Sequence, residues 1–142
     1  MPRILGIDFG DRRFGLALSD PSGMLASAHL VVEGEEGLRK ELSRLFAEEE
    51  VERIVLGLPV NMDGTLGPKA KQVLAFKERL EVEWKKPVDT WDERLTTVQA
   101  QRSLREGGLS RGQRSARVDK VAAQILLQSY LDNRRVSSGG GE

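Results

Sequence analysis

The order in which the hydrophobic period changes along the chain is the feature that most constrains its fold. Short apolar stretches separated by turn-forming residues predict strands at residues 4–9, 14–18 and 24–32. From Glu35 the apolar residues recur every three or four positions, which is typical of an amphipathic helix running to about Glu49. Strands and helices then alternate. A meander followed by β-α-β units predicts an α/β fold, with three antiparallel strands and then parallel strands in one mixed five-stranded sheet flanked by helices.

The second half of the chain supplies the parallel part of this sheet. We expect strands at residues 53–59 and 87–93, with a helix at 67–82 between them. The inner side of this helix is predicted to carry Ala70, Val73, Leu74 and Leu80. Thr96 and Gln99 have the spacing of a capping box, which predicts a helix at 96–107, and a last helix follows at about 115–133. The Gly-, Ser- and Arg-rich stretch 106–116 predicts a flexible loop. We interpret residues 1–136 as one domain and residues 137–142, SSGGGE, as a flexible tail.

The composition excludes several kinds of site. No cysteine is present, which excludes disulfide scaffolds, thiolate-bound zinc and thiol nucleophiles. The 22 basic and 22 acidic residues cancel, so affinity for a polyanion would depend on local charge rather than on the total. No apolar run approaches the roughly 20 residues of a membrane span, and no signal-peptide pattern is found. We therefore expect a cytoplasmic protein without a membrane partner.

Asp8 stands between Ile7 and Phe9, at the end of a strand that we expect to be central. An unpaired carboxylate would be costly to bury there. Two interpretations are open: Asp8 bonds the backbone of the following turn, as Asp beside Gly often does, or it belongs to a site. Glu93 raises the same question at the end of the strand 87–93, where a following helix also favours acids. Asp92 must face the opposite way from Glu93, because side chains alternate along a strand.

Asp119 is the third acid in an unexpected place. On a helical wheel it falls within the arc of Val118, Ala122, Leu126 and Tyr130, so it faces the core side of its helix. A salt bridge to a neighbouring basic residue is the alternative interpretation.

These acids become informative if the fold brings them together. Parallel strands would place Asp8 and Glu93 at the same sheet edge, and a helix packed across the sheet could bring Asp119 over them. Clustered carboxylates repel unless a cation neutralises them, and oxygen ligands of this kind suit Mg²⁺ or Mn²⁺. We predict a metal site formed by Asp8, Glu93 and Asp119, which would also be the catalytic residues.

The remaining chemistry favours hydrolysis of phosphodiester bonds. The only histidine, His29, lies in a predicted strand away from the acids, so a Ser-His or Cys-His nucleophile is not supported. Neither a phosphate-binding P-loop nor a dinucleotide-binding glycine pattern is present. Water activated by a carboxylate-bound metal is then the natural nucleophile.

Local charge indicates a nucleic-acid substrate. Between positions 102 and 120, six basic residues stand against two acids, which suits a phosphate-binding surface, although a solvated surface would show the same run. The turn after Asp8 and the polar loop at 57–68 lie at the same predicted sheet edge, where the loop residues could contact substrate or form turns. The candidate nucleic-acid contacts are Arg12, Arg13, Asn61, Gly64, Thr65, Arg94, Arg111, Arg114, Arg117 and Lys120.

Four stretches follow one another in the chain: GIDFGDRRFGLALSD, IVLGLPVNMDGTLGP, DERLTT and VDKVAAQILLQSYL. Together they resemble the YqgF/RuvX family of ribonuclease H-like nucleases, which is related to Holliday junction resolvases. The resemblance implies a ribonuclease H-like fold, a divalent-metal site and trimming of the 5′ end of precursor 16S rRNA. The family's acids match Asp8, Glu93 and Asp119. Active nucleases of the wider superfamily often carry a fourth carboxylate on the strand that here reads IVLGLP and has none.

We therefore expect a metal-dependent nuclease that acts on structured RNA in ribosome biogenesis. The alternatives are a resolvase acting on branched DNA, which would work as a symmetric pair, and a non-catalytic RNA-binding assembly factor. A kinase of the hexokinase type is disfavoured, because it would need two lobes. The sequence leaves open whether the protein is a monomer or a homodimer and whether it binds one metal ion or two.

Overall fold

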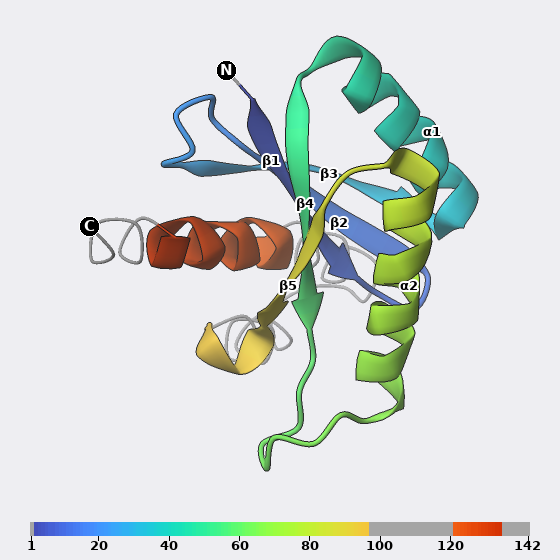
Figure 1. Ribbon diagram of the computed structural model, residues 1–142, viewed down its shortest axis with the longest axis vertical. Helices are drawn as coiled ribbons and strands as arrows, with labels where there is room; N and C mark the ends of the chain where they lie inside the picture. Colours follow the sequence, from blue (N-terminus) through green and yellow to red (C-terminus); the bar gives the residue numbers. More distant parts are fainter. Residues whose placement is uncertain (1, 97–120, 135–142) are drawn as a thin grey trace, which may run out of the picture.

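The computed structural model describes residues 2–96 and 121–134, which form one mixed sheet with helices on both faces (Figure 1). The strand order is β3-β2-β1-β4-β5. The central strand β1 is antiparallel to β2 and parallel to β4. The strands are β1 (Arg3–Phe9), β2 (Arg13–Ser19), β3 (Ala26–Glu33), β4 (Val51–Leu58) and β5 (Val88–Asp92). The predicted meander, the parallel strands and the central position of β1 are all confirmed.

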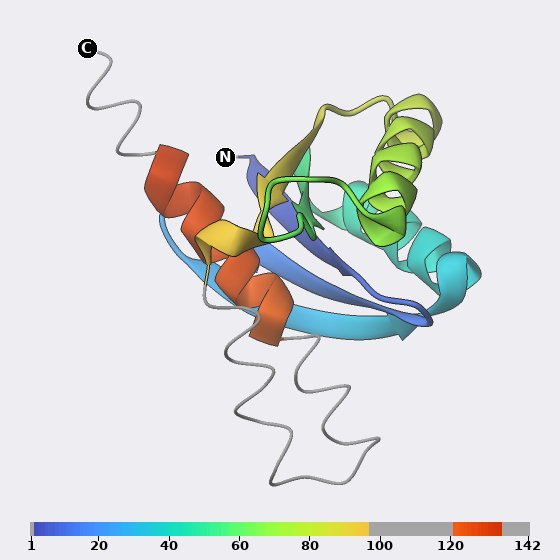
Figure 2. The ribbon, with the colours of Figure 1, turned by 90° about the horizontal axis from the view of Figure 1, so that it is seen from below.

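The helices separate into two groups on opposite sides of the sheet (Figure 2). The helices α1 (Gly34–Glu48) and α2 (Pro68–Trp84) cover one face. The helical segment 121–134 covers the other face. α1 buries Leu38, Leu42 and Leu45, the stripe that its period predicts. Among the described residues, no helix has the length and apolarity needed to cross a membrane.

The two faces of the sheet differ in the size of their side chains. Leu5 and Ile7 of β1 point toward α1 and α2, into a core of large aliphatic and aromatic residues. Ile4, Gly6 and Asp8 alternate with them and point toward the helical segment 121–134. A Cβ at Gly6 would lie 2.9 Å from Leu127 Cβ, so the absence of a side chain there lets this helix approach the sheet closely.

Three element predictions need correction. The third strand begins at Ala26 rather than at residue 24, because Asp20 accepts hydrogen bonds from the backbone of Met24 (2.9 Å) and Leu25 (3.2 Å) and holds them in a turn. In α2, Phe76 is buried and Leu74 only half-buried, so Phe76 takes the inner position that the sequence analysis gave to Leu74.

The fifth strand ends at Asp92, one residue earlier than predicted. Glu93 instead opens a short 3₁₀ helix, η1 (Glu93–Leu95). The Asp92 carboxylate accepts a hydrogen bond from the backbone N–H of Arg94 at 2.9 Å and thereby caps this turn. The chain therefore changes direction at Glu93.

Several predictions lie outside the described residues. They are the helix at 96–107, the loop at 106–116, the first residues of the last helix at 115–120 and the tail at 137–142.

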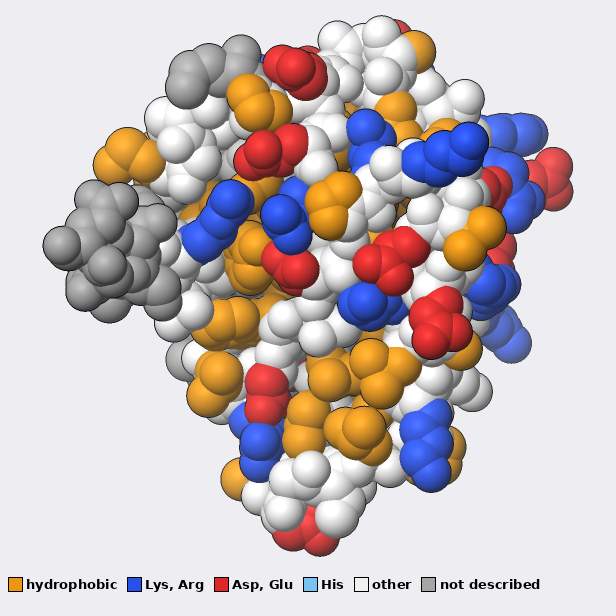
Figure 3. Space-filling model, viewed as in Figure 1, with side chains coloured by type: hydrophobic (Ala, Val, Ile, Leu, Met, Phe, Trp, Pro, Cys, Tyr) orange, Lys and Arg blue, Asp and Glu red, His pale blue; other side chains and the backbone are white. Residues whose placement is uncertain are grey.

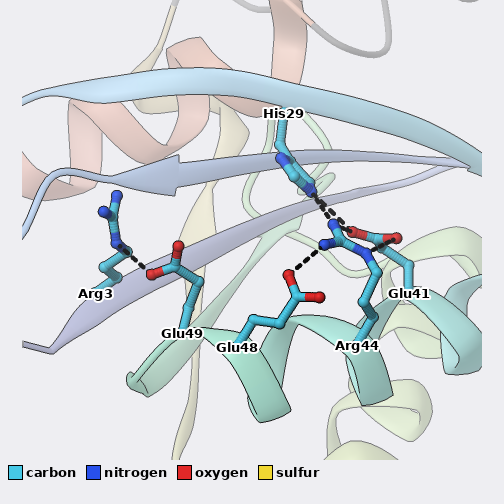
Figure 4. A network of polar contacts seen from close by, with 6 residues as sticks. All are labelled: Arg3, His29, Glu41, Arg44, Glu48 and Glu49. Atoms are coloured by element: carbon cyan, nitrogen blue, oxygen red, sulfur yellow. Dashed lines mark hydrogen bonds and ion pairs between the residues drawn. The ribbon is translucent and has the colours of Figure 1, made fainter.

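His29 joins the edge strand β3 to α1 through a chain of polar contacts (Figure 4). Its Nε2 lies 2.8 Å from Glu41 Oε2. Glu41 also contacts Arg44, whose hydrogen bond is the main reason that the pKa of Glu41 lies below its usual value. Arg44 Nη1 also forms an ion pair with Glu48 Oε2 at 2.7 Å. His29 thus tethers a strand to a helix, on the face opposite to Asp8.

Candidate active site at the carboxyl edge of the sheet

Asp8 and Glu93 are the only buried charged side chains of the described part of the chain. Asp8 is 2% exposed and Glu93 is 5% exposed. Charged carboxylates are rarely buried this far, because desolvation is costly unless other groups compensate for it. The structure therefore singles out the same two acids that the sequence analysis selected in this region.

Gly57 brings these two acids into the same corner of the sheet. β4 runs parallel to β1, and Leu56 pairs with Ile7. Gly57 and Asp8 are the next residues on these two strands, whose axes are about 4.8 Å apart. A Cβ at Gly57 would lie only 2.9 Å from Glu93 Oε1 and 3.3 Å from Glu93 Cδ. The Glu93 carboxylate therefore occupies the space that a side chain at position 57 would fill.

β4 has no acid of its own at this edge, and the Glu93 carboxylate lies against it at Gly57. IVLGLP carries no carboxylate of its own, and Glu93, which follows the next strand, places its carboxylate there. The importance of Gly57 was missed, although a glycine inside a buried strand is a known sign of close approach by another group.

The third predicted acid lies outside the described residues. This holds for Asp119 and for the basic residues predicted to contact nucleic acid, Arg111, Arg114, Arg117 and Lys120. Ala122 and Ala123, which follow Asp119 by three and four positions, are buried against the face that carries Asp8.

Arg12 lies in the turn that follows β1, and Arg13 is the first residue of β2. Gly10 donates a backbone hydrogen bond to Arg13 O at 2.9 Å, and a Cβ at Gly10 would lie 2.5 Å from that oxygen, so only glycine suits this turn. Arg12 is exposed. Arg13 is half-buried, with its Nε 3.6 Å from Glu33 Oε1. Of the two, Arg12 is the one whose side chain is presented to solvent.

Asn61, Gly64 and Thr65 hold together the loop at residues 59–67, which joins β4 to α2. Asn61 N–H donates to Thr65 O at 3.0 Å, and Gly64 N–H donates to Asn61 O at 2.8 Å. Gly64 has a φ of +89°, which favours glycine. The turn-forming interpretation of Asn61 and Gly64 is confirmed, whereas contact of these residues with a substrate stays a prediction.

Arg94 is engaged by its neighbour Asp92. Arg94 Nη2 lies 2.7 Å from Asp92 Oδ2, and Arg94 Nε donates to the same oxygen at 3.0 Å. This hydrogen bonding is the largest cause of the lowered pKa of Asp92. Arg94 Nη1 also contacts Met62 O, at 3.5 Å. Asp92 pairs with Arg94 and Glu93 lies against Gly57, but the predicted alternation along a strand does not apply, because Glu93 belongs to η1.

The sheet order β3-β2-β1-β4-β5 is that of the ribonuclease H-like fold. A structure of RuvC from Thermus thermophilus in complex with a Holliday junction substrate matches 95% of this chain and 96% of that chain, with a TM-score of 0.55 and 15% identity. A second RuvC structure from the same organism matches with a TM-score of 0.51 and 17% identity, covering 94% of this chain and 96% of that one. These matches show the shared fold.

Sequence comparison identifies the family. The family model described as "RuvX: Holliday junction resolvase" matches residues 2–133. A protein of Syntrophomonas wolfei named "Putative pre-16S rRNA nuclease" is 49% identical over 133 residues, covering 92% of this chain and 94% of the relative. A protein of the same name from Halothermothrix orenii is 47% identical, with the same coverage. The chain belongs to the RuvX family, as the resemblance of its four motifs indicated.

Proposed function

We propose that the protein is a metal-dependent nuclease that hydrolyses phosphodiester bonds at the 5′ end of precursor 16S rRNA. The observation that carries this proposal is the burial of Asp8 and Glu93 at the same sheet edge, with Gly57 of the intervening strand leaving room for the Glu93 carboxylate. Buried carboxylates at the same sheet edge repel each other, and a divalent cation held by Asp8 and Glu93 would offset part of the cost of burying their charge. The names of the relatives supply the substrate class.

Asp8 and Glu93 are suited to hold Mg²⁺ or Mn²⁺, because both ions prefer carboxylate oxygens. We propose Asp119 as the third ligand. The helical period that buries Ala122, Ala123 and Leu126 against the sheet, continued upstream, predicts the same face for position 119. When bound, the metal would supply a hydroxide nucleophile and stabilise charge on the phosphate.

Arg12 is the side chain within the described residues that best suits contact with a substrate phosphate. It is exposed four positions after Asp8, whereas Arg13 pairs with Glu33 and Arg94 pairs with Asp92. An arginine already bound to a carboxylate must give up that partner before it binds phosphate. The basic residues at 111–120 complete the proposed RNA-binding surface.

Cleavage of a precursor 16S rRNA fragment, in the presence of Mg²⁺ or Mn²⁺, tests the proposal. Asp8→Asn removes one negative charge at nearly constant shape, so cleavage should fall by roughly a thousandfold, because metal-assisted stabilisation amounts to several kcal/mol. Calorimetric titration with Mn²⁺ should show binding to the parent protein that Asp8→Asn weakens strongly.

The matched control is Asp11→Asn, the same chemical change at an exposed carboxylate in the adjoining turn. This variant should cleave like the parent protein. If Asp8→Asn cleaves as well as Asp11→Asn, with both folded, the proposed mechanism is wrong.

A second candidate is a resolvase that cuts branched DNA. The match to RuvC in complex with a Holliday junction substrate, over 96% of that chain, favours it. Paired cuts in a junction require two active sites related by symmetry. Sedimentation of the protein with junction DNA should then show a homodimer, and a monomer that leaves the junction uncut would exclude this function. RNA binding without metal-dependent cleavage would instead indicate an assembly factor.

A further inference from the structure

Met62 stands at the tip of the loop 59–67 and is the most exposed of the large hydrophobic side chains within the described residues. Its exposed fraction is 89%. A single exposed apolar residue is common on protein surfaces. Met62 differs because hydrogen bonds within the loop hold its backbone and because Arg94, which follows Glu93, contacts its carbonyl oxygen.

The loop holds its own shape through short hydrogen bonds. Asp63 Oδ1 accepts from the Thr65 backbone N–H at 3.0 Å and from the Thr65 hydroxyl at 2.6 Å. Asn61 Nδ2 donates to Thr65 Oγ1 at 3.0 Å. The backbone hydrogen bonds between Asn61 and Thr65 and between Gly64 and Asn61 close the tip. These bonds hold the backbone on both sides of Met62, whose side chain is exposed to solvent.

Arg94 connects this tip to the candidate active site. Its guanidinium is fixed by Asp92 at 2.7 Å, and it contacts the Met62 carbonyl oxygen at 3.5 Å. Arg94 directly follows Glu93, whose carboxylate lies against Gly57. The backbone of Met62 and the buried acid are thus joined through one short turn of chain.

The surroundings of Met62 suit an apolar group rather than a phosphate. Leu66 on the same loop and Leu95 on η1 are 40% and 66% exposed. Figure 3 shows hydrophobic side chains gathered at the lower end of the molecule, around the loop that joins β4 to α2. The charged group in contact with Met62 is Arg94, at 3.5 Å from its carbonyl oxygen, and the positive charge of Arg94 is already paired with Asp92. A nucleic acid offers apolar surface only on its bases, since its backbone is charged.

We propose that Met62 packs against an unstacked nucleobase beside the scissile phosphate, so that the enzyme selects RNA at a boundary between paired and unpaired nucleotides. This inference rests on the proposed function and adds the conformation of the substrate to it. Apolar side chains inserted beside bases replace stacking that is lost when a base leaves its neighbours. The hydrogen-bonded loop supplies such a side chain from a backbone whose shape is already held.

The test uses RNA hairpins with a single-stranded 5′ extension, each carrying 2-aminopurine at one position near the boundary. The fluorescence of 2-aminopurine rises when the base is unstacked. Binding of Asp8→Asn, which holds RNA uncut, should raise the signal at one position. Adding Met62→Ala to this protein should remove the rise. In the cleaving protein, Met62→Ala alone should raise KM by about fivefold, a loss within the range known for base stacking.

Val82→Ala is the matched control, because Val82 is an apolar residue of α2 with an exposed fraction of 78%. It should leave both fluorescence and KM unchanged, and Met62→Leu should behave like the parent protein. Equal fluorescence with Met62→Ala and Val82→Ala overturns the inference while leaving cleavage, and hence the proposed function, intact. If the fluorescence rise depends on Met62 but the parent protein does not cleave RNA with Mg²⁺ or Mn²⁺, the inference about Met62 is supported and the proposed nuclease function is wrong. A change in oligomeric state with Met62→Ala, without a fluorescence effect, assigns Met62 to a second copy of the chain and overturns the inference.

Discussion

The two faces of the sheet are built from the same strands but contain different kinds of side chain. Toward α1 and α2 the strands present large residues such as Leu5, Ile7 and Leu56, which pack into a continuous apolar core. Toward the helical segment 121–134 they present Ile4, Ala17 and Val55, together with Gly6 and Gly57. The difference indicates a division of roles. The face toward α1 and α2 forms the apolar core, whereas the opposite face has small residues that let the helical segment 121–134 and the Glu93 carboxylate approach the sheet.

The two glycines of the second face show that missing side chains serve different purposes. A Cβ at either position would lie 2.9 Å from its nearest neighbour. At Gly6 that neighbour is Leu127 Cβ, which can move only if the helix moves. At Gly57 it is the end of the flexible Glu93 side chain. A methyl group at position 6 should therefore lower the free energy of unfolding. A methyl group at position 57 should instead lower the rate of cleavage.

The largest effect is expected on the face that carries the packing. Leu42 of α1 is fully buried, and Leu42→Ala should lower the free energy of unfolding by about 3 kcal/mol, through lost burial and the cavity left behind. Urea denaturation measures this loss. The cleavage rate per folded molecule should stay unchanged, and a large decrease in it would show that the two faces are not separate in function.

Gly57→Ala should change activity much more than stability. Its methyl group displaces the Glu93 carboxylate, and a misplacement of about 1 Å can reduce a rate by about a hundredfold. Cleavage rates and Mn²⁺ affinity should both fall, while the midpoint of urea denaturation moves little. Unchanged cleavage would show that the Glu93 carboxylate is not used where the structure places it.

Gly6→Ala should lower the free energy of unfolding by about 2 kcal/mol, because overpacking forces the helix away from the sheet. Gly37→Ala is the matched control, since Gly37 lies in α1 and a Cβ there would meet only Val32 Cβ, at 3.8 Å. That change should stabilise the protein by about 0.5 kcal/mol, because alanine favours a helix over glycine. Equal effects of the two substitutions in urea denaturation would contradict a close approach at Gly6.

The smallest effect concerns the polar contacts that hold the helical segment 121–134. Tyr130 donates a hydrogen bond to Asp89 of β5 at 2.5 Å, and Asp89 also pairs with Arg53 at 2.9 Å. Burial, followed by the Asp89 hydrogen bond, raises the pKa of Tyr130 to about 12. The neutral phenol is therefore favoured in the folded state. Its contribution is complete below the ordinary tyrosine pKa near 10 and is lost as the pH rises through about 12.

The parent protein should consequently lose about 1 kcal/mol more stability than Tyr130→Phe between pH 9 and pH 12, after a discount for the solvent-exposed part of the ring. Urea denaturation of both proteins across this range measures the difference, and lysines that titrate in both cancel. Parallel pH profiles would show that the Tyr130–Asp89 contact does not stabilise the folded state.

Much of the fold could be predicted because its signals are local. The change of period at Glu35 locates α1, and the apolar stretches locate the strands within two residues. Asp8 and Glu93 could be selected because a carboxylate at the end of an apolar strand conflicts with its surroundings. The ion pairs of Arg13 with Glu33 and of Arg94 with Asp92 were not predicted, and contact of these two arginines with nucleic acid stays a prediction. The pattern of charges along the chain does not show which acid a basic side chain will reach.

The sequence by itself determined the elements, their order and the acids that need an explanation, because hydrophobic period and turn-forming residues act over a few neighbouring positions. Only the tertiary structure decided that Glu93 leaves its strand and lies over Gly57. That contact joins two strands that are separated in the chain by a helix, and it depends on their register, which no local pattern encodes. The physical reason is that space for a buried carboxylate is made by a neighbouring strand, not by the residues beside it in sequence.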